Sequence, residues 1–217
     1  MSTGTKTTSS NTKALLTAGM IGGPFYVGVS LIQALTRDGF DMQHHAFSLL
    51  SVGDLGWIQV LNFVVAGSLL IAGAVGVRRV LGGQGKASKW GPRLLGFFGA
   101  GAVTAGIFKP DPALGFPAGT PADANDISWH GFIHFGVASL AFIALIAACF
   151  VMARRFTGAW ATWTRVLGVV LIVTLLGISS GSASKNDFVT PAFIAAASLG
   201  YLWCSAVAAK LKGEVKA

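Results

Sequence analysis

The sequence predicts an all-α integral membrane protein, a bundle of six transmembrane helices, and three observations carry that prediction. Hydrophobic residues make up 53% of the 217 residues and charged residues only 11%, against roughly 25% in an ordinary soluble domain. The mean hydropathy is +0.67. Six stretches are continuously apolar over, or close to, the ~20 residues that a helix needs to cross a bilayer. A soluble globule is excluded, and so is a barrel, whose strands would alternate apolar and polar residues.

The first predicted span, 14–35, follows a polar segment. The second, 57–77, begins at Trp57 and ends before Arg78 and Arg79. The third, 90–108, begins at Trp90 and ends before a lysine and a proline. Tryptophans mark such boundaries because their amphipathic rings prefer the membrane–water interface.

The fourth predicted span, 132–152, follows a histidine-bearing run. The fifth, 166–183, starts after Arg165, and the sixth, 189–209, ends before Lys210. No Asp, Glu, Lys or Arg falls at mid-depth in any of the six spans. Ion-coupled carriers usually place an ionisable group there, so this pattern disfavours an ion-coupled transporter.

No linker divides the chain, and we therefore expect one six-helix transmembrane domain over residues 14–209. The segment 1–13 is polar and lacks the short apolar core and the cleavage site of a secretory signal, so we expect a disordered cytoplasmic tail there. Residues 210–217 are expected to form a basic cytoplasmic tail.

Small and amide-bearing residues in the spans favour contacts between helices. Gly19 and Gly23 stand four residues apart on an apolar helix, a spacing that allows a neighbouring backbone to approach closely. Gln59 and Asn62 lie in the first turns of the second span, where we expect hydrogen bonds between helices.

The formal net charge of +8 would suggest nucleic acid as a partner in a soluble protein. In a membrane protein it sets the orientation instead, because Lys and Arg are retained in the cytoplasm. Thirteen basic residues flank one end of the predicted spans and three flank the other, so both termini are expected to be cytoplasmic. All four histidines and seven of the eight acidic residues then face outward. Membrane lipids, and not nucleic acid, are the expected partners, and the oligomeric state is left open.

Two long outward-facing loops, 36–56 and 109–127, are the places where we expect function. The second contains four of the seven prolines, and loops of this length are more often functional or disordered than simple connections. The apolar residues of the first suit a short helix in the outer interface that acts as a lid or a lipid rest: Phe40, Met42, Phe47, Leu49 and Leu50.

The run 126–134 carries the candidate site, because residues 126, 130 and 134 share one helix face, with only ~40° of drift per step. His130 and His134 are thus placed to chelate one ion, as in zinc sites, and a catalytic zinc needs a third protein ligand and an open position for water. The candidates for that ligand are Asp111, in the second loop, and His44 or His45, of which we favour His45.

Two other interpretations stay open. A haem would take His130 or His134 together with His44 or His45, because axial ligands approach the iron from opposite sides. Alternatively the histidines are structural and hydrogen-bond to neighbouring loops, while Asp126 caps the fourth helix.

Three blocks of sequence carry a family resemblance. Block 45–59 begins His-Ala-Phe-Ser and ends Gly-Trp-Ile-Gln, block 108–117 begins Phe-Lys-Pro-Asp-Pro, and block 129–134 reads Trp-His-Gly-Phe-Ile-His. Together they resemble domain-of-unknown-function family 998, a group of multi-pass bacterial and archaeal membrane proteins. The chain departs from the family pattern at Ala46, where the usual His-Pro-x-Ser has a proline. It also departs at Lys109 and Pro110, where the usual Phe-Pro-Thr-Asp-Pro has proline and threonine. The resemblance implies a six-helix fold in a prokaryotic cell membrane and implies no activity.

A more distant similarity, of composition alone, is to the membrane hydrolases that include alkaline ceramidases and adiponectin receptors. Their zinc is held by three histidines with a Ser and an Asp nearby. Those proteins have seven helices and carry the histidine pair in the last one, whereas the pair here opens the fourth.

The leading hypothesis from the sequence is an outward-facing site that binds a divalent metal such as zinc and hydrolyses a lipid or an amide. Bound metal would lower the pKa of its water toward ~7, and Ser48 or Asp54 would act as candidate catalytic residues that position the substrate. The alternative is a non-enzymatic membrane scaffold or small-ligand carrier, and a b-type haem protein is the third interpretation. Four residues form the expected metal site: His45, His130, His134 and Asp111.

Overall fold

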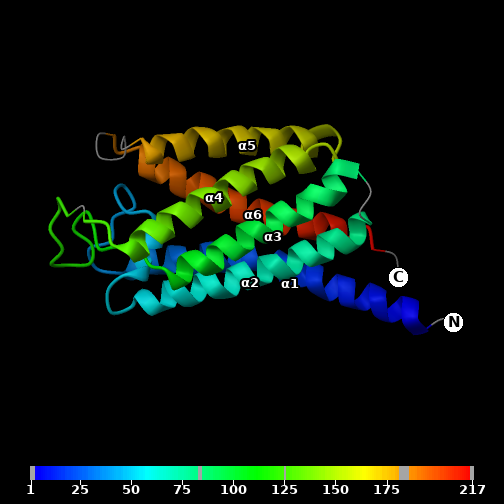
Figure 1. Cartoon of the computed structure of the whole chain (residues 1–217), viewed down its shortest axis with the longest axis horizontal. Helices are drawn as coiled ribbons and strands as arrows, with labels where there is room; N and C mark the ends of the chain where they lie inside the picture. The colour runs from blue at the N-terminus through cyan, green and yellow to red at the C-terminus, as the bar shows by residue number, and fades with distance from the viewer. Residues whose placement is uncertain (1–2, 83–84, 125, 181–185, 216–217) are drawn as a thin grey trace.

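The computed structural model describes residues 3–82, 85–124, 126–180 and 186–215, and over these residues the chain is all-helical, as predicted, with no β-sheet. The α-helices run side by side along the long axis of the molecule (Figure 1). They are α1 (Thr3–Thr36), α2 (Gly56–Leu81), α3 (Gly85–Ile107), α4 (Trp129–Met152), α5 (Gly158–Ser179) and α6 (Val189–Lys212), with a short 3-10 helix η1 (Phe47–Ser51) between α1 and α2.

Both chain ends lie at one end of the bundle, which we call the terminus end, and the two long loops lie at the other, which we call the loop end (Figure 1). Among the described residues, five helices are long and apolar enough to cross a membrane: α1, α2, α4, α5 and α6. These five match the predicted spans 14–35, 57–77, 132–152, 166–183 and 189–209.

The third predicted span, 90–108, is helical in the structure but does not join those five. Its helix, α3, is rich in glycine and carries Pro92 and Arg93 in its second turn, which lowers its mean hydropathy. In space α3 extends along the bundle between α2 and α4 (Figure 1) and packs against both.

Two helices extend into the predicted terminal tails. α1 begins at Thr3 and so includes most of the segment 1–13 that we expected to be disordered, because a formed helix adds residues at little cost compared with nucleation. α6 continues to Lys212, into the predicted basic tail. Residues 1–2, 181–183 and 216–217 of the predicted segments lie outside the described residues.

Small residues set the spacing of α1, α2 and α6. A Cβ atom built on Gly73 of α2 would lie 2.6 Å from the Cα of Gly19 in α1, so the two backbones are in direct contact. The backbone N–H of Gly23 donates to Ser205 Oγ of α6 at 2.9 Å, and that hydroxyl donates to the carbonyl oxygen of Gly19 at 2.8 Å. The glycine pair predicted from the sequence therefore packs within this chain.

A buried polar cluster joins α1 to α2 near the loop end. Gln59 Oε1 accepts from Gln33 Nε2 at 2.7 Å, and Asn62 Nδ2 donates to the carbonyl oxygen of Tyr26 at 3.0 Å and to Ser30 Oγ at 3.1 Å. Buried polar groups in an apolar medium need such partners. The expectation of helix–helix hydrogen bonds from Gln59 and Asn62 is confirmed.

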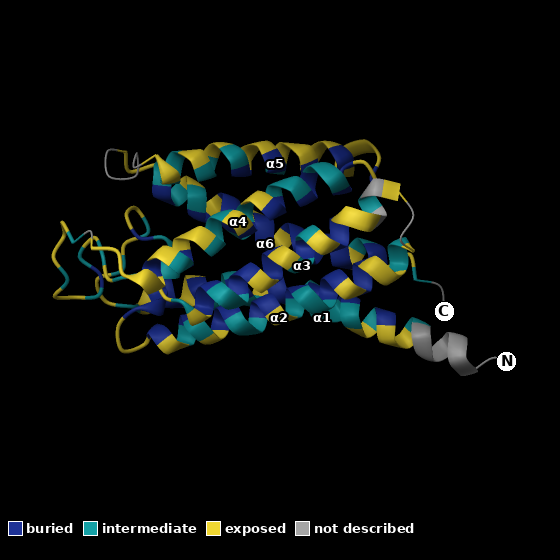
Figure 2. Cartoon of the chain, viewed as in Figure 1, coloured by how far each residue is buried: buried dark blue, intermediate teal, exposed yellow. Residues whose placement is uncertain are grey.

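The two halves of the bundle are filled differently. In the terminus half, large aliphatic side chains are almost wholly buried between the helices, among them Leu16, Val77, Met152 and Leu211. Toward the loop half, aromatic rings form the centre, where Tyr26 stacks on Tyr201 with ring centroids 3.8 Å apart. Figure 2 shows that buried residues line the inside of the bundle, whereas α5 is exposed along its outer face.

The contact between α1 and α2 predicts opposite effects for two glycine substitutions. We expect Gly73→Ala to lower the free energy of unfolding by about 1–3 kcal/mol, because the new methyl group collides with the α1 backbone. Gly28→Ala is the matched control, since nothing lies within 4 Å of a Cβ at that position, and it is expected to be neutral or stabilising by up to about 1 kcal/mol. Unfolding in mixed detergent micelles measures both, and equal effects would contradict the proposed contact.

Candidate functional site

Arg37, just after α1, organises the loop end of the bundle. Its guanidinium donates to the carbonyl oxygens of Leu50 and, at 2.8 Å, of Val52, which fixes η1 against the end of α1. The same group lies 4.9 Å from the centroid of the Phe116 ring in the second loop. Burial lowers the pKa of Arg37, and the nearby Asp54 carboxylate acts in the opposite direction. The exposed Asp54 therefore neighbours this loop cation.

His45 ties the two loops together through both of its ring nitrogens. Nδ1 accepts the backbone N–H of Asp41 at 2.9 Å, and Nε2 lies 2.9 Å from the carbonyl oxygen of Leu114, to which it donates. The ring is 4% exposed and packs against Phe40 and Phe116. With both nitrogens bonded to backbone groups, neither has a lone pair directed at a metal.

The other loop histidine, His44, is exposed and bonds Asp41 Oδ2 through Nδ1 at 2.8 Å. The backbone N–H of Gln43 and the His44 ring hold the pKa of Asp41 below its usual range. The sign follows from linkage: the stability supplied by these bonds is present above the ordinary carboxyl pKa and is lost as the pH falls through the lowered value.

Asp111 and Ser128 cap the start of α4. Asp111 Oδ2 accepts the backbone N–H of Ser128 at 2.9 Å, and Ser128 Oγ accepts the N–H of Gly131 at 3.2 Å. Asp111 lies so close to Gly131 that a Cβ at that glycine would overlap its carboxylate. Both residues satisfy backbone donors that a helix N-terminus leaves open, so the capping role expected of Asp126 belongs to Asp111 and Ser128.

The two histidines of α4 have different surroundings although they stand one turn apart. His130 is exposed and lies against Trp129, with ring centroids 3.6 Å apart. His134 is only 2% exposed. Its Nδ1 lies 2.9 Å from the carbonyl oxygen of Ala105 and 2.8 Å from that of Phe108. Carbonyl oxygens only accept, so Nδ1 carries a proton and Nε2 is left to face away from α3.

The structure therefore does not gather the four expected metal ligands. Within the described part of the chain, no group of three or more His, Cys, Asp or Glu side chains is placed to hold a metal ion. His45 is used by the loops, Asp111 by the start of α4, and His130 stands at the surface. The physical reason is that backbone groups already occupy both ring nitrogens of His45, Oδ2 of Asp111 and Nδ1 of His134.

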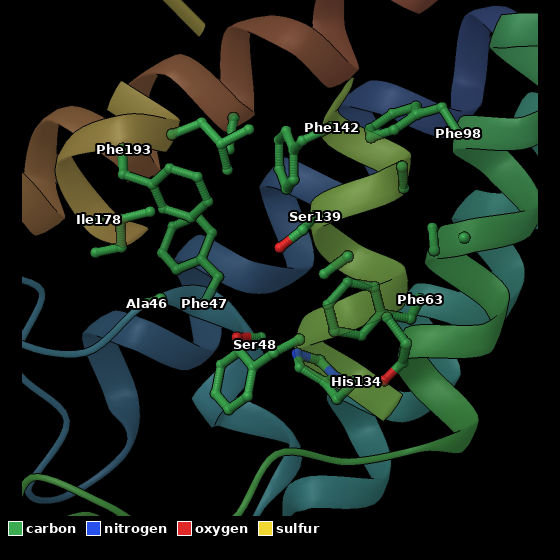
Figure 3. Close-up of a pocket in the computed structure, with 18 of the residues that line it drawn as sticks. Ala46, Phe47, Ser48, Phe63, Phe98, His134, Ser139, Phe142, Ile178 and Phe193 are labelled. Carbon is green, nitrogen blue, oxygen red and sulfur yellow. Dashed lines mark hydrogen bonds between the residues drawn. The ribbon is translucent and has the colours of Figure 1, made fainter. Parts of the chain in front are cut away.

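A cavity of about 350 Å³ lies inside the loop half of the bundle (Figure 3). His134 and Ser48 lie at one end of it, and Ser139 points into it from α4. All six helices and η1 contribute to its wall, which is mainly apolar and aromatic and includes Tyr26, Phe47, Phe63, Phe98, Ala138, Phe142, Leu175, Ile178, Phe193, Ile194 and Tyr201.

The sequence pointed to three residues of this cavity, Ser48 and His134 as site residues and Phe47 as part of a lid, and missed the rest. No motif unites the lining residues, since they come from seven separate elements. One signal was available in α3 and α4, where small residues recur at helical spacing, as at Gly101, Ala102 and Ala105. Small side chains that face one another across a bundle leave room between the helices.

The two loop histidines supply a paired prediction. His45→Phe leaves the Asp41 N–H and the Leu114 carbonyl without partners, and we expect it to lower the free energy of unfolding by about 1–3 kcal/mol. His44→Phe, at the exposed neighbour, is expected to change it by no more than about 0.5 kcal/mol. Thermal unfolding, together with limited proteolysis of the loop 108–128, measures the difference. If His44→Phe were the more damaging substitution, the assigned bonds would be refuted.

Comparison with known proteins places the chain in one family. Residues 20–210 match the family described as "Protein of unknown function (DUF998)", and the chain therefore belongs to that family, as its signature blocks predicted. Neither the curated proteins nor the solved structures contain a significant match to the chain.

Proposed function

We propose that this chain, as a multi-pass membrane protein of the DUF998 family, binds a lipid-like amphiphile inside its helical bundle and serves as a small-ligand carrier. The observation that carries the proposal is the cavity of about 350 Å³, which lies within the range of ligand pockets, roughly 300–1,000 Å³. Its apolar wall suits a hydrocarbon chain, and its few polar groups lie where a head group would sit.

The cavity wall indicates the kind of head group. Among the lining residues there is no Asp, Glu, Lys or Arg, and a charged head group would lose its hydration there without an opposite charge. His134 Nε2 offers a hydrogen-bond acceptor, and the hydroxyls of Ser48 and Ser139 can donate or accept. A neutral head that carries a hydroxyl or an amide N–H matches these groups.

The surrounding contacts indicate how such a ligand enters. η1, held by Arg37, covers the cavity at the loop end, since Phe47 and Ser48 face the cavity while Leu49 packs in a separate cluster with Val52 and Phe116. On the side of the bundle, two lining residues, Phe135 of α4 and Ser179 of α5, are exposed. Entry from the bilayer between α4 and α5 therefore fits better than entry from water.

The proposed arrangement in the membrane has α3 as a sixth span and the loop end outside a prokaryotic plasma membrane. An even number of crossings places both termini on one side, in agreement with their shared end of the bundle (Figure 1). The excess of basic residues near that end supports a cytoplasmic location.

Hydrolysis of the bound lipid or amide is a second candidate function, because His134 and Ser48 face the same cavity. The bond from His134 Nδ1 to backbone carbonyls leaves Nε2 free to accept a proton. A metal-dependent version would further require His45, His130 and Asp111 to leave their present partners. Release of acyl chain from a monoacylglycerol by the wild type, abolished in His134→Ala, would support this candidate over simple carriage.

Filling the cavity tests the carrier proposal. We expect Ser139→Trp to reduce the amount of amphiphile that co-purifies with the protein by about tenfold, because the indole occupies the cavity. Leu140→Trp is the matched control, since that neighbour is 55% exposed on the outside of α4 and does not line the cavity. Mass spectrometry of extracted lipids measures both variants. Equal retention by the two, or a wild-type protein without bound amphiphile, would refute the proposal.

The absence of charge in the described cavity wall predicts a head-group preference. A diazirine-bearing monoacylglycerol should label the protein at least about tenfold more efficiently than a diazirine-bearing fatty acid at pH 8, where the carboxylate is ionised. Peptide mapping should place the labels on α4 and α6. Preferential labelling by the fatty acid would show that the assigned head-group chemistry is wrong.

A further inference from the structure

A second hollow lies outside the bundle, between α5 and α6 toward the terminus end. It has a volume of about 520 Å³ and an almost wholly apolar wall, and none of its lining residues borders the cavity described above. We call it the α5–α6 groove. Its wall includes three of the six tryptophans and is formed by Ala159, Trp160, Trp163, Thr164, Val166, Leu167, Val170, Leu199, Leu202, Trp203 and Ala206.

The groove follows the axes of its two helices. Along α6 its lining residues recur from Leu199 to Ala206, and Lys210 stands one further turn along the same face. The Lys210 ammonium lies 5.0 Å from the centroid of the Trp160 ring and 5.9 Å from that of Phe156. A cation therefore lies at the terminus end of the apolar α5–α6 groove, whose open side faces away from the bundle.

The charge of Lys210 has no carboxylate partner within the described residues. The acidic residue nearest in sequence, Glu214, is bonded instead to Arg155, whose guanidinium nitrogen lies 2.6 Å from its carboxylate. The last turn of α6 adds a second basic residue, Lys212. The positive charge at this end of the groove is thus available to a ligand.

We infer that the α5–α6 groove binds an anionic phospholipid, with an acyl chain along the groove and its phosphate at Lys210. Tryptophan rings prefer the depth of the head groups, and lysine extends its ammonium toward that depth while its methylenes stay in the apolar layer. The Trp203 indole is fixed as a wall because its N–H donates to Thr164 Oγ1 at 3.2 Å. The anionic lipids of a cytoplasmic leaflet supply the complementary charge.

The inference is independent of the ligand proposed for the internal cavity, and its test uses separate variants. The full chain is placed in nanodiscs of phosphatidylglycerol and phosphatidylcholine in equal parts, and the lipid retained after mild detergent extraction is counted by native mass spectrometry. The wild type should retain phosphatidylglycerol in preference to phosphatidylcholine by about tenfold. Retention of the two lipids in equal amounts would overturn the inference.

Two variants locate the site. Lys210→Gln should abolish the preference for phosphatidylglycerol, whereas Lys212→Gln, which removes the same charge from the same helix end without the contact to Trp160, should keep it. Equal losses would show a general attraction to the basic end and would overturn the assignment to Lys210.

Ala206→Trp should reduce retention of both lipids by filling the groove, and retention at the wild-type level would place the lipid elsewhere. Circular dichroism establishes that each variant is folded. The amphiphile of the internal cavity should co-purify with all three variants as it does with the wild type, so loss of lipid from the groove is separable from loss of the internal ligand.

Discussion

Hydrogen bonds from side chains to backbone carbonyls hold the loop end of this protein together, and the rest of the site depends on them. Arg37 donates to two carbonyls of the η1 region and His45 to that of Leu114. His134 bonds the carbonyls of Ala105, near the end of α3, and of Phe108, just after it. Irregular backbone near a membrane leaves carbonyls that no helix satisfies. Two of these side chains, His45 and His134, were expected to bind a metal, but here they satisfy backbone carbonyls.

This use of the histidines explains which parts of the site could be predicted from the sequence. His130 and His134 lie one turn apart on α4, as predicted, but two residues on one helix face can still have different surroundings. The carbonyl that engages His45 lies 69 residues away along the chain, and no local pattern indicates that partner. The apolar spans, by contrast, follow from composition over ~20 residues. Five of the six predicted spans meet this measure in the structure, whereas α3 falls short of it because of its glycines, Pro92 and Arg93.

The position of α5 connects the internal cavity with the outer groove. α5 contacts α4 and α6 and forms part of the wall of both hollows, the cavity near its end and the groove near its beginning. The helix lies at the periphery, with Val173 and Leu176 more than half exposed. A peripheral helix is the element that can shift at the lowest cost in free energy to admit a ligand, and α5 is the least buried of the five candidate spans.

The unequal filling of the two halves has a consequence for the membrane itself. Leu16, Val77, Met152 and Leu211 close the terminus half, and η1 covers the cavity from the opposite side. In the proposed arrangement, the hollow space is then reached from the lipid phase, between α4 and α5. A protein that holds its guest molecule in such a space would need no aqueous path through the bundle, and the bilayer around it would keep its electrical resistance.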